Sequence, residues 1–258
     1  MRVAALFDIH GNLPALDAVL EEAARADIDA FVVGGDVVPG PMPRETLQRL
    51  LSLDRPVHFI HGNGELAVLA QMATAEPGLA TYWGTTSGRP LPEPLQAGYR
   101  WTAQQLHPEY EPVLAAWPKT VRLPIRGLGD VLFCHATPRS ETALFTRRTA
   151  EERLLPLFEG LGANVVVCGH THMQFDRRIG GTRVVNAGSI GQPFGAPGAC
   201  WLLLGPGVEM RRNAYDFVRA AEQFRATRYP QAEESATGIL SPPPEDEMLE
   251  LFGQWEVK

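Results

Sequence analysis

The first 70 residues alternate short apolar runs with amphipathic stretches, and this alternation restricts the possible folds more than any other feature of the chain. Residues 3–7 are all apolar, which is typical of a buried parallel strand. Asn12 can then cap a helix whose apolar side chains fall on one face. Residues 30–33 and 57–60 predict two further strands, with a helix over residues 43–53 between them. Strand–helix–strand repeats of this length indicate a parallel sheet with right-handed crossovers.

The alternation is interrupted and then returns. Residues 76–124 are rich in proline, glycine and aromatic side chains, and we interpret them as an insertion that lies over the sheet edge. Further along the chain the pattern predicts strands over residues 131–134 and 164–168, a helix over 150–161, a hairpin over 176–185, an antiparallel pair over 199–204 and 208–212, and a helix over 216–227. These elements belong to one expected domain over residues 1–230.

The end of the chain differs in composition. Residues 231–258 are acidic and proline-rich, which predicts a C-terminal tail that is mobile over residues 233–247. Residues 249–255 could dock as a last short helix.

Composition and charge exclude several classes of function. The formal net charge of -7 argues against a broad grip on nucleic-acid backbone, although it leaves room for a nucleotide bound through metal ions. No stretch reaches the ~18 apolar residues of a membrane span, and the first residues lack a signal-peptide pattern. Cys134, Cys168 and Cys200 sit in or beside apolar runs without CxxC spacing, so we expect core residues in a reducing compartment. The expectation is a cytoplasmic protein that binds neither membrane nor long nucleic acid.

Polar side chains that can bind metal follow the expected strands at the point where each strand ends. The segments are Asp8-Ile9-His10, Gly34-Gly35-Asp36, Gly62-Asn63, Cys134-His135 and Gly169-His170-Thr171-His172. The carboxyl ends of parallel strands lie along one edge of an open α/β sheet, where such folds place their sites. Asp-x-His, Gly-Asp and Gly-Asn alone have ordinary explanations as helix caps or turns. Two histidines two residues apart after a buried strand, as in Gly-His-Thr-His, seldom serve packing. All five in this order, each after an apolar strand, predict a shared metal site.

The ligand types indicate which metals to expect. Carboxylate, imidazole and amide oxygen together suit Mn²⁺, Fe²⁺ or Zn²⁺ better than Ca²⁺, which prefers an all-oxygen cage. Two such ions roughly 3.5–4 Å apart can clamp a phosphate and acidify a bridging water. Asp36 is the natural residue to bridge them. A purely structural metal site is a poorer explanation, because its ligands form a closed tetrahedral cage rather than an open edge.

This ordered set resembles the calcineurin-like metallophosphoesterases, and most of all their compact prokaryotic branch of small phosphodiesterases and diadenosine tetraphosphatase-related proteins. The resemblance runs from Val3 to about Tyr215 and includes the linker at residues 101–106 and the segment Asn186-Ala187-Gly188-Ser189-Ile190-Gly191-Gln192-Pro193. It implies an α/β fold, an α+β sandwich of two mixed β-sheets packed face to face and flanked by helices.

The resemblance also implies roles for individual residues. One metal would be held by Asp8, His10 and His172, the other by Asn63, His135 and His170, with Asp36 bridging both. The implied cofactors are two divalent transition-metal ions, Mn²⁺ first, with Fe, Zn or Ni as alternatives. The implied catalytic residues are Asp36, Asn63 and His135, acting through in-line attack of a metal-bridging hydroxide on phosphorus.

The sequence departs from the family pattern at Gly64, where many members carry a histidine that protonates the leaving oxygen. General-acid help is worth 10²–10⁴ in rate, so we hypothesise a preference for leaving groups that need little protonation: aryl esters, phosphoanhydrides or activated diesters. His61 or a water could replace the missing acid, although His61 could equally be packed at a strand end. Asn12 could reach the substrate phosphate, or it could only cap its helix.

The function that these residues predict is hydrolysis of small or nucleotide-like phosphoesters, with a diester or anhydride preferred. A protein phosphatase or nuclease is a variant of this hypothesis. The alternative is a catalytically weakened metal-binding scaffold, like the retromer scaffold subunit of the same superfamily, and Gly64 would suit that alternative. The complete set of ligands favours the enzyme. The sequence does not predict the oligomeric state.

Two groups of side chains have both a binding and an ordinary explanation. Tyr82, Trp83 and Tyr99 could line a nucleotide pocket beside the metals, but aromatic side chains more often belong to the core. Arg139, Arg147 and Arg148 could contact an anionic substrate, but a solvated surface role is the ordinary expectation.

Overall fold

The computed structural model describes residues 1–73 and 92–257, and they contain two five-stranded β-sheets. The first sheet has the order β10-β9-β1-β2-β3, formed by Val208–Asn213, Ala199–Leu204, Val3–Leu6, Ala30–Val33 and Val57–Phe59. Strands β1, β2 and β3 are parallel, and β9 and β10 add an antiparallel edge. The expected pair over residues 199–212 is therefore confirmed and extends the parallel part of the sheet.

The second sheet has the order β4-β5-β6-β8-β7, formed by Thr120–Ile125, Gly129–Cys134, Val165–Cys168, Thr182–Asn186 and Phe175–Ile179. Here β5, β6 and β8 are parallel, while β4 and β7 are antiparallel edge strands. The hairpin around Gly180 and Gly181 is confirmed as the β7–β8 pair. Strand β4 begins at Thr120, so the sheet begins before residue 124, where the insertion was expected to end.

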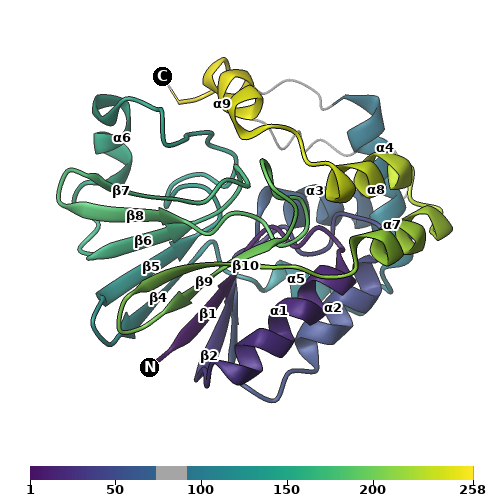
Figure 1. Ribbon diagram of the computed structural model, residues 1–258, viewed down its shortest axis with the longest axis horizontal. Coiled ribbons are helices and arrows are strands. Elements are labelled where there is room, and N and C mark those ends of the chain that lie inside the picture. Colours follow the sequence, from purple (N-terminus) through teal and green to yellow (C-terminus); the bar gives the residue numbers. More distant parts are fainter. Residues whose placement is uncertain (74–91, 258) are drawn as a thin grey trace.

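Helices surround the two sheets (Figure 1). They are α1 (Leu13–Arg25), α2 (Pro43–Leu51), α3 (Asn63–Met72), α4 (Glu93–Gln105), α5 (Tyr110–Ala115), α6 (Glu151–Phe158), α7 (Phe217–Ala226), α8 (Ala232–Leu240) and α9 (Glu245–Gly253). Helices α1 and α2 lie beside the first sheet and α6 beside the second. Within the described residues, no helix combines the length and the apolar character needed to cross a membrane.

Strand β1 shows how the layers are built. Ala4 and Leu6 pack in a core cluster with Leu16 of α1, whereas Val3 and Ala5 pack in another with residues of the second sheet such as Val165. Because alternate side chains of a strand point to opposite faces, one fully apolar strand serves both cores. A third cluster lies between the second sheet and α6. The expected sandwich of two mixed sheets flanked by helices is confirmed.

The C-terminal segment, for which the composition predicts a tail that is mobile over residues 233–247, forms the helices α8 and α9. Ala236 and Ile239 of α8 are buried against α7. Some of the acidic side chains of this segment pair with arginines: Glu233 accepts from Arg225 at 2.7 Å and Asp246 from Arg148 at 2.7 Å. The expected docking of the last helix agrees with α9, in which Leu249 is buried.

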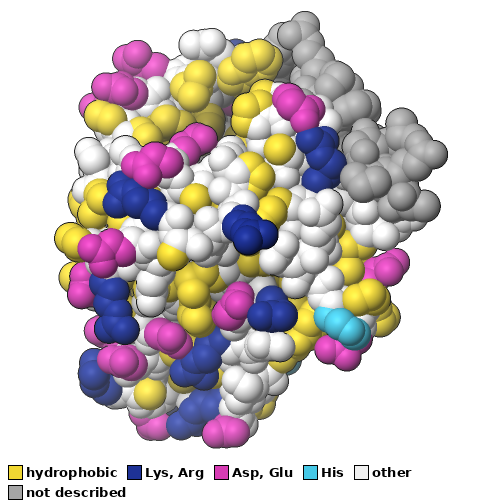
Figure 2. Space-filling model, turned by 90° about the vertical axis from the view of Figure 1, so that its right-hand side faces the viewer, with side chains coloured by type: hydrophobic (Ala, Val, Ile, Leu, Met, Phe, Trp, Pro, Cys, Tyr) yellow, Lys and Arg dark blue, Asp and Glu magenta, His cyan; other side chains and the backbone are white. Residues whose placement is uncertain are grey.

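Charges are mixed on the surface that carries the helices at the right of Figure 1. On the face drawn in Figure 2, basic and acidic side chains are interspersed between apolar ones. Exposed ion pairs also occur on the surface, such as Arg49–Asp17, whose nitrogen and oxygen are 2.8 Å apart. Such exposed pairs contribute ~0–1 kcal/mol each to stability.

Candidate metal centre

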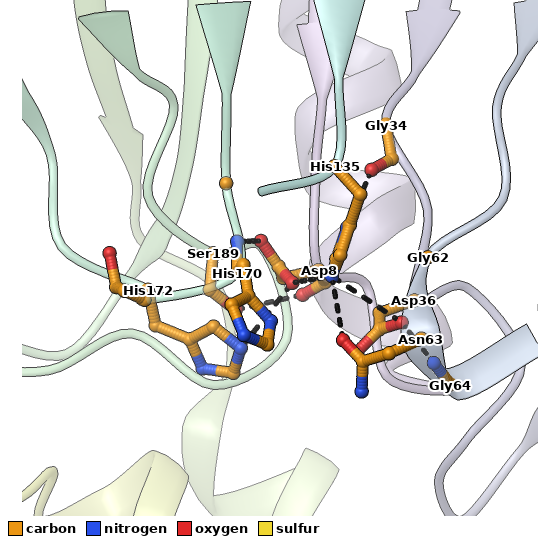
Figure 3. Close-up of polar contacts among 12 residues, drawn as sticks. Asp8, Gly34, Asp36, Gly62, Asn63, Gly64, His135, His170, His172 and Ser189 are labelled. Carbon is orange, nitrogen blue, oxygen red and sulfur yellow. Dashed lines mark hydrogen bonds and ion pairs between the residues drawn. The ribbon is translucent and has the colours of Figure 1, made fainter. Parts of the chain in front are cut away.

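The polar side chains that follow the strands meet at one end of the sandwich (Figure 3). Asp8 and His10 follow β1, Asp36 follows β2, Asn63 begins α3 after β3, His135 follows β5, and His170 and His172 follow β6. They come from both sheets, not from the edge of a single parallel sheet as the strand pattern alone suggested. Packing the sheets face to face brings their strand ends together.

The loops after β1 and β2 continue the parallel pairing of the strands. The backbone N–H of Asp8 donates to Gly35 O at 3.1 Å, and that of His10 donates to Asp36 O at 2.9 Å. The hydrogen-bonded ladder therefore fixes the relative positions of these two loops.

The backbone at the candidate ligands is strained. Asp8, His10, Asp36, His170 and His172 have φ values of 53°, 50°, 52°, 68° and 58°. They are five of the six non-glycine residues with positive φ in the described part of the chain. Such conformations cost about 1–3 kcal/mol each and persist where the surrounding structure fixes them, which is typical of functional sites.

The first group of candidate ligands is formed by Asp8, His10 and His172. Asp8 Oδ1 lies 3.4 Å from Nε2 of His172 and 3.9 Å from Nε2 of His10, and the two Nε2 atoms are 3.1 Å apart. This oxygen is buried and accepts no hydrogen bond from the described residues. A buried carboxylate oxygen without a partner is costly, so the three atoms fit a divalent cation held between them.

The second group surrounds His135. Its Nε2 lies 3.1 Å from Asn63 Oδ1, 3.6 Å from Asp36 Oδ1 and 3.8 Å from Asp8 Oδ1. The ring of His170 stands edge-on to that of His135, with centroids 5.1 Å apart. The other oxygen of Asp36, Oδ2, lies 3.9 Å from Nε2 of His10. Asp36 therefore presents one oxygen to each group.

Backbone carbonyls orient two of the imidazoles. Nδ1 of His135 is 2.9 Å from Gly34 O, and Nδ1 of His172 is 2.8 Å from Gln192 O. A carbonyl oxygen can only accept, so in each ring Nδ1 carries the hydrogen and Nε2 presents its lone pair to the cluster. This is the usual arrangement of metal-binding histidines.

The electrostatics of the cluster suit a cation. Burial and the neighbouring histidines lower the pKa of His10 to about 3 and that of His170 to about 3, so both rings are neutral at pH 7. Burial raises the pKa of Asp36. Burial alone would also raise the pKa of Asp8. The neighbouring histidines His172, His135 and His10 outweigh it and hold the pKa of Asp8 well below its usual range. Burial alone would lower the pKa of His135, but the attraction of Asp36 and Asp8 for its proton outweighs this effect, so the pKa is raised. The carboxylates of Asp36 and Asp8 therefore favour positive charge at this position, as a bound cation would supply.

Comparison with known proteins identifies the family. The family model of the calcineurin-like phosphoesterase superfamily domain matches residues 1–205. The chain belongs to the calcineurin-like phosphoesterase superfamily. Its fold and its candidate metal ligands agree with this membership.

Two solved structures share the superfamily fold over nearly the whole chain. The hypothetical protein PH1004 from Pyrococcus horikoshii OT3 is 20% identical, with a TM-score of 0.77, and the match covers 94% of this chain and 99% of that one. A metallophosphoesterase from Sphaerobacter thermophilus is 25% identical, with a TM-score of 0.72, and the match again covers 94% and 99%. Both matches extend past residue 205, where the family model ends. A search of curated proteins found no match.

Glu65 supports the centre of this superfamily member and was not singled out from the sequence. Its fully buried carboxylate accepts hydrogen bonds from the backbone N–H groups of Asp36 and Val37 at 2.7 Å and of Gly62 at 2.8 Å. It thereby ties the loop after β2 to the start of α3. The only local signal was its position three residues after a glycine at a helix start, where Glu commonly bonds the cap.

Gly64, the position that departs from the superfamily pattern, has no room for a side chain. A Cβ atom there would lie 2.4 Å from Cγ of Pro39 and 2.8 Å from Oδ1 of Asp36. The surrounding residues, and not this position alone, are therefore adapted to glycine.

Asn12 and His61 differ in how the structure uses them. Asn12 Oδ1 accepts from Ala15 N at 3.1 Å, and its Nδ2 donates to Gly191 O and to the Tyr215 hydroxyl. These bonds occupy the amide of Asn12 and favour its capping role. His61 is half-buried, and its backbone N–H donates to Pro118 O at 3.1 Å.

The aromatic and arginine side chains with a possible binding role differ in where they lie. Tyr82 and Trp83 lie outside the described residues. Tyr99 of α4 lines a cavity that also reaches His10. Arg147 and Arg148 pair with Glu245 and Asp246 of α9, which agrees with a surface role.

Proposed function

We propose that this protein is a dinuclear-metal phosphoesterase that hydrolyses small or nucleotide-like phosphoesters, with diesters or anhydrides preferred. The observation that carries the proposal is the position of Asp36. Its Oδ1 lies 3.6 Å from Nε2 of His135 and its Oδ2 lies 3.9 Å from Nε2 of His10. A carboxylate shared in this way between two groups of ligands suits a pair of ions at a fixed spacing.

The proposed site combines seven ligands with an open side. When bound, two divalent ions, Mn²⁺ first and Fe, Zn or Ni as alternatives, supply Lewis-acid charge that polarises the phosphoryl group and acidifies water. The proposed ligands are Asp8, His10, His172, Asp36, Asn63, His135 and His170. The side chains of His10 and His172 are each 12% exposed while that of Asp8 is 0% exposed, so substrate approaches from the side of these two histidines.

Residues of the chain contribute to the reaction in two further ways. Oδ1 of Asn63 points to His135, which leaves its Nδ2 group to donate to a phosphoryl oxygen. Neutral His10 and His170 add no positive charge of their own that would compete with the ions. No general acid at position 64 protonates the leaving oxygen, which favours leaving groups of low pKa.

Other properties of the protein remain part of this proposal. Three buried cysteines without a disulfide suit a reducing, cytoplasmic compartment. The partner we propose is a small-molecule or nucleotide substrate, not long nucleic acid or a membrane.

The test is turnover of bis-p-nitrophenyl phosphate and p-nitrophenyl phosphate by the metal-stripped protein after Mn²⁺, Ni²⁺, Zn²⁺ or Mg²⁺ is added back. We expect a transition metal to restore turnover and the Asp36→Asn variant to lose it. No turnover with any metal, while two ions are bound per chain, would reject the enzyme and favour a metal-binding scaffold.

A further inference from the structure

A cavity of about 510 Å³ opens beside the metal centre and reaches it at His10. Its walls come from α4, from residues 192–194, and from the C-terminal segment that includes α8. Nine of the sixteen described residues that line it lie between Tyr229 and Pro243, past the residues that the family model matches. The volume is in the range of sites that bind small molecules, ~300–1,000 Å³.

Aromatic and apolar side chains form part of the cavity wall beside the metal centre. Phe194 lines the cavity and stacks on the ring of His172, with centroids 5.4 Å apart and an interplanar angle of 23°. The ring of Phe252 in α9 meets Phe194 edge-on at 6.0 Å and supports it from the other side. Tyr99 and Tyr229 add two further aromatic rings to the lining. A flat apolar group could therefore lie in the cavity while its attached phosphate lies at the metal ligands.

The charges of the cavity are unsuited to a chain of phosphates. Among the described lining residues, the acidic side chains are Glu233 and Glu234. His10 is the one basic side chain among them, and none is Lys or Arg. Glu233 is paired with Arg225, which itself does not line the cavity. Additional phosphates of a nucleoside polyphosphate would meet these two carboxylates and, among the described lining residues, no Lys or Arg, which is unfavourable.

We propose, on the basis of the function proposed above, that this cavity binds the organic group of the substrate and selects an uncharged aromatic ester group, such as an aryl group without further phosphates. The glycine at position 64 agrees with this choice. Aryl leaving groups need little protonation, whereas alkyl leaving groups depend on an acid that this chain lacks there. Of the three substrate classes that Gly64 allows, the cavity favours aromatic esters over phosphoanhydrides.

Two phosphodiesters with one common leaving group test the proposal. Methyl p-nitrophenyl phosphate and phenyl p-nitrophenyl phosphate release the same p-nitrophenolate and differ only in the group that stays on phosphorus. We expect kcat/KM to be about 10- to 100-fold higher for the phenyl diester, the factor that burial of an aromatic ring can supply. Equal values would overturn the proposal, as would faster hydrolysis of a dinucleoside tetraphosphate than of the phenyl diester.

Gly238 of α8 offers a way to fill the cavity without disturbing the fold. It lines the cavity, and a Cβ added there meets no atom within 4 Å. We expect Gly238→Phe to lower kcat/KM for the phenyl diester by about 10-fold and to lower that for the methyl diester less. Gly253 of α9 also has open space at its Cβ and does not line the cavity, so Gly253→Phe is the matched control and keeps the phenyl preference. An unchanged preference in Gly238→Phe would contradict the assignment.

A binding measurement separates this proposal from the proposed activity. Isothermal titration of the metal-loaded protein with phenylphosphonate and methylphosphonate needs no turnover. About 10-fold tighter binding of phenylphosphonate, reduced in Gly238→Phe, supports the cavity even if no substrate is hydrolysed. Equal affinities would reject the cavity proposal even in an active enzyme.

Discussion

The backbone N–H of Gly64 donates a 2.6 Å hydrogen bond to Oδ1 of Asp36, the carboxylate that faces both groups of candidate ligands. A side chain at position 64 would displace this oxygen, because its Cβ would lie 2.8 Å away. The absence of a side chain at Gly64 and the position of Asp36 are therefore parts of one arrangement.

Gly64→Ala is expected to weaken both the fold and metal binding. The new methyl group would overlap Pro39 and Asp36, and overpacking of this kind costs about 1–3 kcal/mol in the free energy of unfolding. Thermal unfolding and a Mn²⁺ titration measure the two effects. Gly181→Ala, at a glycine with no atom within 4 Å of its Cβ, is the control and should change little. Equal stability of the two variants would disprove the packing account.

Glu65→Gln is expected to loosen the loop that carries Asp36. The carboxylate accepts three short backbone hydrogen bonds, and an amide NH₂ in place of one oxygen would face N–H donors. Hydrogen bonds to a charged group are worth ~1.5–3 kcal/mol each, so we expect a loss of at least ~2 kcal/mol in urea unfolding. The exposed Glu250→Gln change in α9 should stay within ~0.5 kcal/mol. A loss no larger than this control would show that Glu65 does not hold the loop.

The metal-free protein should lose stability through His10 as the pH falls. Its pKa in the folded protein is about 3, below its usual value of 6.5, so between these values the unfolded chain binds a proton that the folded chain excludes. Above pH 6.5 the stability of the folded protein therefore does not change with pH through His10, and it falls progressively as the pH drops from 6.5 towards 3. Unfolding of chelator-treated wild type and His10→Gln at several pH values measures it. The stability of the variant relative to wild type should rise as the pH falls from 7 to 4, and a constant difference would refute the shift.

The three cysteines should not react with thiol reagents in the folded protein. Cys134, Cys168 and Cys200 are buried, and burial raises the pKa of each thiol, that of Cys200 to about 11. The thiolate is the reactive form. Ellman's reagent should therefore detect three thiols in denaturant and none in the native state. Rapid labelling of the native protein would show that this part of the core opens.

The metal ligands could be proposed from sequence because their signal is local. Each follows an apolar run directly, as Asp8 follows β1 and Asp36 follows β2, and the end of a parallel strand defines a place in the fold. The strand pattern alone could not predict that the later strands form a second sheet. The parallel β5 and β6 look like a continuation of the first sheet until their pairing is known.

Other features depend on contacts between distant residues. Acidic side chains of α8 and α9 pair with Arg225, Arg147 and Arg148, and the last two lie 98 residues from their partners in sequence. Composition therefore suggested mobility where ion pairing and burial produce helices. Glu65 was missed for a similar reason, because its partners at Asp36 and Val37 lie in another loop.

The most direct test of the account is a crystal structure of the Mn²⁺-soaked protein with anomalous scattering data. We predict two anomalous peaks on either side of Asp36, one bound by Asp8, His10 and His172 and the other by Asn63, His135 and His170. A single peak, or none among these residues, would contradict the dinuclear centre.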